Sequence, residues 1–442
     1  MIQLSDHFNT RRLLRFTLPS IIMMVFTSIY GVVDGFFVSN FAGKTPFAAV
    51  NFIMPVLMIL GCSGFMFGTG GSALIAKLLG EKREQKANAV FTMLVVCAAA
   101  LGVLLAVLGI VLLPAIAALL GAEGELLRNC VLYGRIVLLA TPFYLLQYEF
   151  QCLCPTAQKP KLGLYVTVAA GVCNMTLDAL FVGVFRWGLA GAAAATAFSQ
   201  LAGGAIPLVY FAKRRPGSLL YFTAFQFDGQ ALAKTCANGS SELMSNISMS
   251  IVSMLYNTQL MRWAGEDGVS AYGVLMYVSM IFMAIFIGYC VGSSPIVSYH
   301  YGAENRAELR GLRKRSLGII AVTALFMFAA GELAGRPLAT LFVGYDEALL
   351  DMTAHAFAIF SCSFLLSGFS IFGSSFFTAL GDGLTSALIS FLRTLVFQVA
   401  AVLIFPMVWG LDGIWLSIVA AEVMSVLVTV VFLLVKRRKY GY

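Results

Sequence analysis

Two carboxylates, an amide and a hydroxyl stand inside otherwise apolar stretches in the first half of the chain: Asp34, Asn174, Asp178 and Thr196. Asn174 and Asp178 are four residues apart, which places them on one face of a helix. A charged side chain inside a bilayer costs on the order of a few kcal/mol, so each is a candidate functional residue. Oxygen ligands suit a small hard cation such as Na⁺, and a close pair of carboxylates also suits a proton.

A second set of charged residues lies in apolar stretches of the second half. Glu242 and Arg393 are expected at similar depths, and we predict that they form an ion pair, either functional or a static clamp between helices. Glu149 lies near the end of its apolar run, and we interpret it as a side chain that snorkels to the membrane surface.

The composition defines the elements that must position these residues. Of the 442 residues, 60% are hydrophobic and 11% are charged, and the mean hydropathy is +0.89. A soluble domain has about 25% charged residues, so a water-soluble enzyme, a disordered chain and a secreted disulfide scaffold are excluded. Runs such as 95–116 and 423–435 do not alternate between apolar and polar residues, which excludes a membrane β-barrel. The sequence predicts an all-α integral membrane protein.

Apolar runs and polar breaks predict twelve transmembrane helices. The expected spans are 13–39, 47–77, 88–120, 126–152, 161–185, 189–211, 232–263, 269–299, 310–342, 349–378, 385–408 and 413–435. Asp34, Asn174, Asp178 and Thr196 then fall at similar depths in the outer half of the membrane.

Basic residues separate by loop. One side of the predicted topology carries 22 of the 29 lysines and arginines: Arg11, Arg12, Arg15, Lys77, Lys82, Arg83, Lys86, Lys159, Lys161, Lys213, Arg214, Arg215, Lys234, Arg306, Arg310, Arg313, Lys314, Arg315, Lys436, Arg437, Arg438 and Lys439. The positive-inside rule therefore places both termini in the cytoplasm. We expect the protein to lie in the plasma membrane. The net charge of +8 follows from this topology, so we expect no nucleic-acid partner.

An internal repeat divides the chain. When the sequence is aligned with itself so that Gly70 falls on Gly292, Gly80 falls on Gly302, Gly43 on Gly265, and the stretch Trp187-Gly188-Leu189 on Trp409-Gly410-Leu411. Six helices per repeat is an even number, so both repeats have the same orientation. The repeat predicts two six-helix bundles, residues 1–217 and 218–442, related by a pseudo-two-fold axis along the membrane normal.

The same alignment tests whether the polar residues belong to the framework. Asp34, Asn174, Asp178 and Thr196 fall on Tyr256, Val396, Ala400 and Ile418. The helix framework therefore does not require the polar cluster, and the cation site is expected in the first bundle alone.

Three features carry a resemblance to a known family: Val33-Asp34-Gly35-Phe36-Phe37-Val38-Ser39, the pair Asn174 and Asp178, and Trp187-Gly188-Leu189. They resemble the MATE (multidrug and toxic compound extrusion) family. The stretch 41–80, with Gly68-x-Gly70-Gly71-Ser72-Ala73, is most similar to the bacterial MepA-like branch of that family. The resemblance covers essentially the whole chain. It implies export of amphiphilic, often cationic compounds by antiport with H⁺ or Na⁺, through alternating access. It also implies that Asp34, Asn174, Asp178 and Thr196 bind the coupling ion.

Other functions receive less support. A lipid-linked oligosaccharide flippase of the same superfamily is the alternative, but its anionic cargo calls for several intramembrane cations, and Arg393 is the one clear example. An enzyme is not expected, because the chain has no HExxH or GxSxG motif. The nine cysteines show no zinc spacing. We expect no cofactor, no metal beyond Na⁺ at the cation site, and a monomer in the lipid bilayer.

Overall fold

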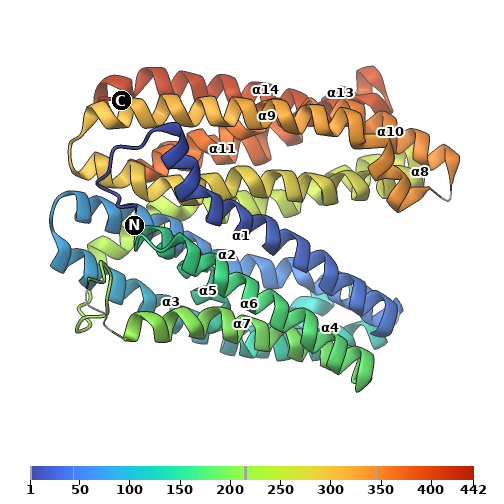
Figure 1. The fold of residues 1–442 in the computed structure, drawn as a ribbon. Coiled ribbons are helices and arrows are strands. Elements are labelled where there is room, and N and C mark those ends of the chain that lie inside the picture. Colours follow the sequence, from blue (N-terminus) through green and yellow to red (C-terminus); the bar gives the residue numbers. More distant parts are fainter. Residues whose placement is uncertain (1, 43, 214–216, 345) are drawn as a thin grey trace.

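The computed structural model describes residues 2–42, 44–213, 217–344 and 346–442. Gly43, Arg214 and Arg215, which belong to the repeat and charge patterns, lie outside these residues. The described residues form helices joined by short segments, and they contain no strand (Figure 1). The prediction of an all-helical protein is confirmed.

The first half forms one bundle, drawn in blue to green in Figure 1. Its main helices are α1 (Thr10–Phe37), α2 (Lys44–Gly80), α3 (Glu84–Leu119), α4 (Gly124–Leu139), α5 (Thr141–Thr156), α6 (Pro160–Asp178) and α7 (Gly188–Ala212). Two short π-helices, η1 (Val38–Ala42) and η2 (Ala179–Val184), continue α1 and α6.

The second half forms the other bundle. Its elements are α8 (Gly229–Gly302), α9 (Arg306–Val343), α10 (Glu347–Ser361), α11 (Phe364–Ala379), α12 (Gly383–Phe391), the π-helix η3 (Leu392–Val396), α13 (Phe397–Trp409), α14 (Leu411–Val435) and α15 (Arg437–Tyr440). Four of these helices begin at a residue whose side chain accepts backbone N–H groups: Asp228, Asn305, Asp346 and Asp382. Such caps satisfy donors that the first turn of a helix leaves free.

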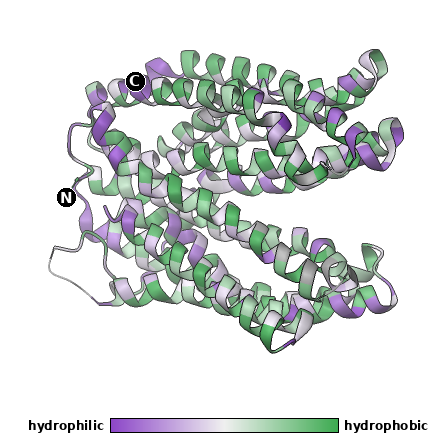
Figure 2. Cartoon of the chain, turned by 45° about the vertical axis from the view of Figure 1, so that its right-hand side comes forward, coloured by the Kyte–Doolittle hydropathy of each residue, from purple (hydrophilic) through white to green (hydrophobic). Residues whose placement is uncertain are grey.

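The number of spans agrees with the predicted twelve once α8 is divided. Among the described residues, nine helices are long and apolar enough to cross a membrane, and two bent pairs bring the number to eleven. The 74 residues of α8 would extend about 110 Å, several times the thickness of a bilayer core. Gly265 interrupts this helix with a φ of 64° and a ψ of −150°, so α8 is two spans. Figure 2 shows apolar residues along the helices and hydrophilic residues gathered mainly at their ends.

Backbone features recur at equivalent positions of the repeat. The break between α4 and α5 at Ala140 corresponds to the break between α10 and α11 at Cys362, and the two pairs bend by 59° and 48°. Lys82 and Glu304, which correspond in the repeat, both have positive φ, as do Gly188 and Gly410. The two halves therefore repeat in conformation, although their sequences share few residues.

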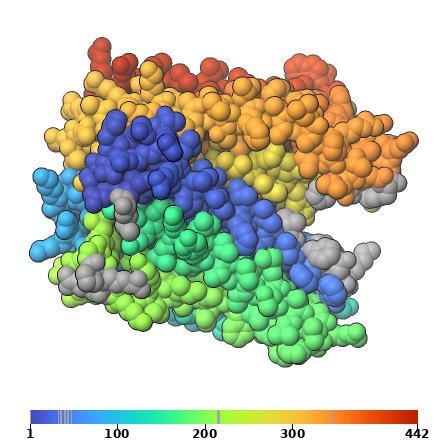
Figure 3. Space-filling model, viewed as in Figure 1, coloured from blue at the N-terminus to red at the C-terminus, as the bar shows by residue number. Residues whose placement is uncertain are grey.

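Both termini lie at the same end of the molecule (Figure 1), as an even number of spans requires. We call this the basic end, because lysines and arginines gather there around residues 80–84 and 302–306 and at the C-terminus. Figure 3 shows the two halves packed together at the basic end and separated by a notch at the opposite end.

Glycines allow the close packing at the basic end. A Cβ atom added to Gly80 would overlap the carbonyl oxygen of Tyr299, and one added to Gly302 would overlap that of Lys77. Lys77 and Tyr299 are themselves equivalent positions of the repeat, so the two halves meet through a pseudo-symmetric contact. α2 and the second part of α8 make this contact backbone to backbone.

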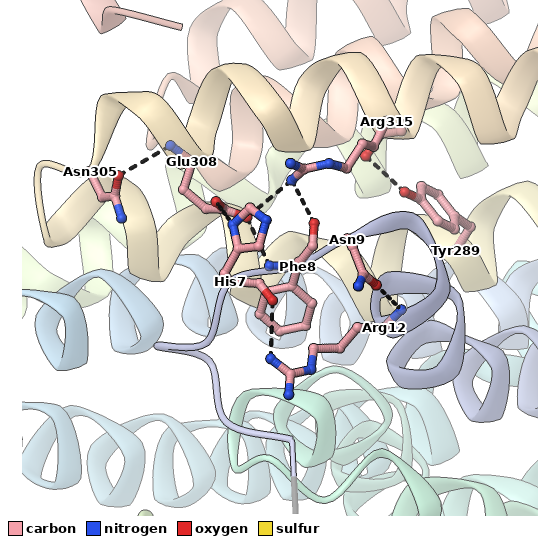
Figure 4. A network of polar contacts seen from close by, with 9 residues as sticks. His7, Phe8, Asn9, Arg12, Tyr289, Asn305, Glu308 and Arg315 are labelled. Atoms are coloured by element: carbon pink, nitrogen blue, oxygen red, sulfur yellow. Dashed lines mark hydrogen bonds and ion pairs between the residues drawn. The ribbon is translucent and has the colours of Figure 1, made fainter.

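The N-terminal strap, residues 2–9, leaves the first half and packs on the second (Figure 4). Phe8 is fully buried, and its N–H group donates to Oε1 of Glu308 at 2.9 Å. Nδ1 of His7 lies 2.6 Å from Oε2 of the same carboxylate. Arg315 donates to the carbonyl oxygen of Phe8 at 2.5 Å and to Glu308 at 3.2 Å. The strap thus fastens the start of α1 to α9 at the basic end.

The segment that joins the two halves packs on the first half, whereas the N-terminal strap packs on the second. Asn88 and Thr92 of α3 accept hydrogen bonds from the N–H groups of Tyr221 and Thr223 at 2.8 and 2.9 Å. Leu220 is buried in the core of the first half. Residues 218–223 therefore pack against the first bundle, and the division between bundles at residue 217 stays a prediction.

Candidate cation-binding site

The four polar residues predicted in the first half lie on three helices that meet away from the basic end. Asp34 is near the end of α1, Asn174 and Asp178 are at the end of α6, and Thr196 is in the third turn of α7. Asp34, Asn174 and Asp178 are 8%, 2% and 0% exposed, so protein surrounds both carboxylates. The Asp34 carboxyl group lies beside Asn174 and Asp178. The structure therefore brings these three residues together as expected.

A fifth residue, Tyr133 of α4, completes the cluster. Its side chain is fully buried, and its hydroxyl lies near Thr196 and within electrostatic range of Asp34 and Asp178. Tyr133 is not among the predicted site residues, because a tyrosine in an apolar span is a common core residue and the direction of its side chain does not follow from spacing. Its repeat counterpart is His355, and this difference between the halves is a signal that could have identified it.

Two π-helices border the cluster. η1 begins four residues after Asp34, and η2 begins directly after Asp178. A π-turn interrupts the regular backbone hydrogen bonds of a helix and often marks a functional site. Sequence patterns did not predict either segment, since a π-turn depends on how neighbouring helices pack.

The cluster contains six buried oxygens that have no hydrogen-bond partner among the described residues. They are Oδ1 of Asp34, Oδ1 of Asn174, both carboxylate oxygens of Asp178, Oγ1 of Thr196 and the hydroxyl of Tyr133. Buried polar atoms without partners are costly and uncommon, so the cluster calls for a ligand that accepts oxygen coordination or supplies a proton. No described group of three or more His, Cys, Asp or Glu side chains could hold a metal ion. The donor set fits Na⁺ or a proton better than a transition metal.

The prediction that Arg393 forms an ion pair with Glu242 is wrong, because Arg393 has another partner. Arg393, which lies on η3, binds Glu422 of α14 rather than Glu242. Its Nε lies 3.0 and 3.1 Å from the two oxygens of Glu422, and its Nη2 lies 2.8 Å from Oε1. This bidentate contact is the geometry that guanidinium and carboxylate groups favour. The expected depth in the membrane could not distinguish Glu242 from Glu422 as the partner of Arg393, because both acids are expected at a similar depth.

Glu242 instead lies where the two halves meet. Its carboxyl group lies within electrostatic range of Cys62 of α2, Cys152 of α5 and Cys290 of α8. It is partly exposed, and it forms no ion pair with any side chain in the described part of the chain. Glu242 is therefore an uncompensated acid at the seam between the bundles.

The interpretation of Glu149 as a snorkelling side chain is also wrong. Glu149 is fully buried, and neither carboxylate oxygen has a hydrogen-bond partner within the described ranges. Its neighbours include Cys97 and Cys152. The helix turns this side chain into the bundle, because α5 is covered by α2, α3 and α7 along its length.

The comparisons with known proteins agree with the fold and the repeat. The sequence model of the MatE family matches twice, over residues 19–180 and 243–404. The two matches cover most of the chain, and the positions at which they begin are almost equivalent in the repeat.

Individual relatives match over nearly the full length. The multidrug export protein MepA of Staphylococcus aureus (strain MRSA252) is 24% identical over 412 residues, which is 93% of this chain and 90% of MepA. A solved structure described as the outward-facing conformation of a multidrug resistance MATE family transporter of the MOP superfamily is 23% identical. It superposes with a TM-score of 0.91 over 98% of this chain and 97% of its own. A MATE protein solved in complex with MaL6 has the same identity, TM-score and coverage.

Proposed function

The chain belongs to the MatE family, and we propose that it is a secondary active multidrug exporter. It is a multi-span membrane transporter of the plasma membrane and not an enzyme. Its cargo is amphiphilic and often cationic, as the acid at the seam between the bundles and the export function of the MepA relatives support. The coupling ion is H⁺ or Na⁺, no further cofactor takes part, and the transporter works as a monomer.

The cluster of unpartnered oxygens around Asp34 carries this proposal. Asp34 and Asp178 are two neighbouring carboxylates in a buried site, and no described cationic side chain pairs with either. Like charges in so dry a place cannot both stay ionised without a counter-ion. A cation or a proton resolves this conflict, and Asn174, Thr196 and Tyr133 supply further oxygens.

Ion binding can change the conformation through α1. Asp34 is followed by η1, and Asp178 by η2, so both ligands sit next to irregular turns that can repack at small cost. Neutralising the carboxylates lets α1 and α6 approach each other. Transport requires that the ion and the cargo prefer different arrangements of the helices, because a ligand shifts an equilibrium only by its differential affinity.

The arrangement of the two halves supports alternating access. They touch through Gly80 and Gly302 at the basic end and are separated at the other end (Figure 3). We infer that the basic end faces the cytoplasm, with both termini inside, which makes this arrangement open to the outside. The opposite state requires the glycine contact to open.

The second half argues against an anionic cargo. A flippase for anionic headgroups would need a free intramembrane cation. Arg393 is not free, because its guanidinium donates three hydrogen bonds to Glu422. Glu242 is free of a cationic partner among the described side chains, and it is an acid at the seam between the bundles. The balance of free charge thus favours cationic compounds.

Ethidium transport into the lumen of everted vesicles, which corresponds to efflux from cells, tests the proposal, with a pH gradient and a Na⁺ gradient imposed separately. We expect one gradient to drive efflux in the unmodified protein. Asp34→Asn should reduce efflux to the level of vesicles without the protein, since the site loses the charge that the ion neutralises. Asp351→Asn is the matched control, because Asp351 is exposed and pairs with Arg336 outside the cluster. Full efflux by Asp34→Asn under both gradients would overturn the assignment.

A further inference from the structure

A cavity of about 120 Å³ lies at the basic end, between the two halves. The end of α2 and the start of α3 line it from the first half, and the start of α8 lines it from the second. Four cationic side chains line this cavity: Lys77, Arg83, Lys86 and Lys234. Its volume is several times what one water molecule needs.

Two carboxylates also line the cavity, but both already have partners. Glu81 lies 3.9 Å from Nζ of Lys77 and 3.5 Å from Nη1 of Arg83. Asp228 caps α8, where its Oδ1 accepts hydrogen bonds from two backbone N–H groups of the first turn. Glu81 therefore balances charge on the side of the cavity formed by α2 and α3, and Asp228 stabilises the first turn of α8 on the other side.

Lys86 and Lys234 remain with unbalanced positive charge. Both are exposed, and neither is in an ion pair with any residue of the described ranges. Lys86 belongs to α3 of the first half and Lys234 to α8 of the second half. A single anion in the cavity can therefore contact both halves at once.

The position of the cavity indicates the kind of anion. Leu74, Leu78 and Val90 form an apolar part of its wall, and they belong to helices that cross the membrane. Lysines next to membrane spans attract anionic lipids, whose phosphate groups lie at the membrane surface. A free phosphate ion would make no use of the apolar wall, whereas a lipid can lay its glycerol and acyl carbons against it.

We propose that this cavity binds the phosphate group of an anionic phospholipid, and that Lys86 and Lys234 hold it from the two halves. The bound lipid bridges α3 and α8 in the arrangement that closes the basic end. Binding to this arrangement stabilises it by mass action. The binding does not depend on the proposed transport cycle, so it can be tested without a transport assay.

Native mass spectrometry of the full chain in a neutral detergent tests the proposal. Phosphatidylglycerol, phosphatidylcholine and inorganic phosphate are titrated in turn, and thermal unfolding is followed in parallel. We expect phosphatidylglycerol to bind and raise the unfolding temperature, and phosphatidylcholine to do neither. The double variant Lys86→Gln/Lys234→Gln should bind phosphatidylglycerol about 30-fold more weakly.

Matched variants separate the cavity from general surface charge. Lys159→Gln/Lys161→Gln removes the same charge from another loop of the basic end and should bind like the unmodified protein. Lys86→Arg/Lys234→Arg keeps the charge and should retain binding, and thermal unfolding of the lipid-free glutamine variant checks that it is folded. Equal binding of phosphatidylglycerol by the glutamine variant and the unmodified protein would overturn the proposal. So would displacement of the lipid by millimolar inorganic phosphate, because the ligand would then be the free ion.

Discussion

The two halves of this transporter share a helix framework, yet they treat their buried acids in opposite ways. In the first half, Asp34 and Asp178 lie side by side without a cationic partner in the described part of the chain. In the second half, Glu422 is 2% exposed and is held by the guanidinium of Arg393. The first half has acids whose negative charge a bound ion can neutralise, whereas the second half neutralises its buried acid with its own arginine.

The alignment of the repeats makes this difference informative. Arg393 and Glu422 correspond to Gly171 and Gln200 of the first half, one turn closer to the basic end than Asn174 and Thr196. Tyr256 stands where the first half has Asp34, and it stacks on Tyr272 at 5.3 Å between ring centres. Since the backbone repeats while these residues do not, the shared helix framework does not require the polar cluster of the first half. We expect ion coupling to belong to the first half alone.

Breaking the internal ion pair should have the largest effect on stability. Arg393→Met leaves Glu422 buried without its partner, and we expect a loss of about 3–5 kcal/mol in the free energy of unfolding. Asp178→Asn in the first half removes a carboxylate that has no cationic partner within the described ranges, so it should not lower stability. Thermal and denaturant unfolding of both variants in detergent measures the contrast.

The double variant Arg393→Met/Glu422→Gln provides the control for that prediction. Removing both charges leaves no unpaired ion, so most of the lost stability should return. Equal destabilisation by Arg393→Met and by the double variant would mean that packing of the arginine, and not the ion pair, stabilises the second half.

The close helix contacts at Gly80 and Gly302 test a feature that the two halves share. An added methyl group at either position meets a backbone carbonyl oxygen, so the helices must move apart. We expect Gly80→Ala and Gly302→Ala each to lower the stability of this closed arrangement by about 1–3 kcal/mol and to similar extents. Gly318→Ala is the control, because a Cβ atom there has no neighbour within 4 Å. Clearly unequal effects at the two glycines would contradict the pseudo-symmetric contact.

Much of the fold could be predicted from the sequence, because lipid requires long apolar helices and basic residues mark one side. The repeat was visible in glycines such as Gly80 and Gly302, since close helix crossings tolerate few other residues. The partner of Arg393 could not be predicted, because helix rotation decides between Glu242 and Glu422. The burial of Glu149 could not be predicted for the same reason: its depth follows from the sequence, but the direction of its side chain depends on helix rotation.

The hydroxyl of Tyr133 offers a finer comparison of the two halves. Tyr133→Phe removes one oxygen from the cluster but keeps both carboxylates, so coupling should weaken without being lost. We expect the cation concentration for half-maximal ethidium efflux to rise by about 10-fold. Tyr256→Phe removes a buried hydroxyl from the corresponding region of the second half and should leave this concentration unchanged. Equal shifts in the two variants would show that the coupling site is not confined to the first half.

Asp382 provides a comparison outside the membrane spans, because the first half has no acid at the corresponding position. We expect its replacement to have the smallest effect on stability. Nζ of Lys436 and the hydroxyl of Tyr440 each lie 2.7 Å from its Oδ2 and donate to it, whereas the first half has Pro160 at the corresponding position. Burial raises the pKa of Asp382, but these hydrogen bonds outweigh it and hold the pKa below its usual value of 3.8. The folded state therefore favours the charged form, which stabilises the protein above about pH 4 and stops doing so as the pH falls through the lowered pKa. Asp382→Asn should lower stability by about 0.5–1 kcal/mol at pH 7, and its difference from the unmodified protein should shrink below pH 4. Unfolding temperatures between pH 7 and pH 3 check this, and a difference that stays constant across the range would show that the aspartate acts only as the cap of α12.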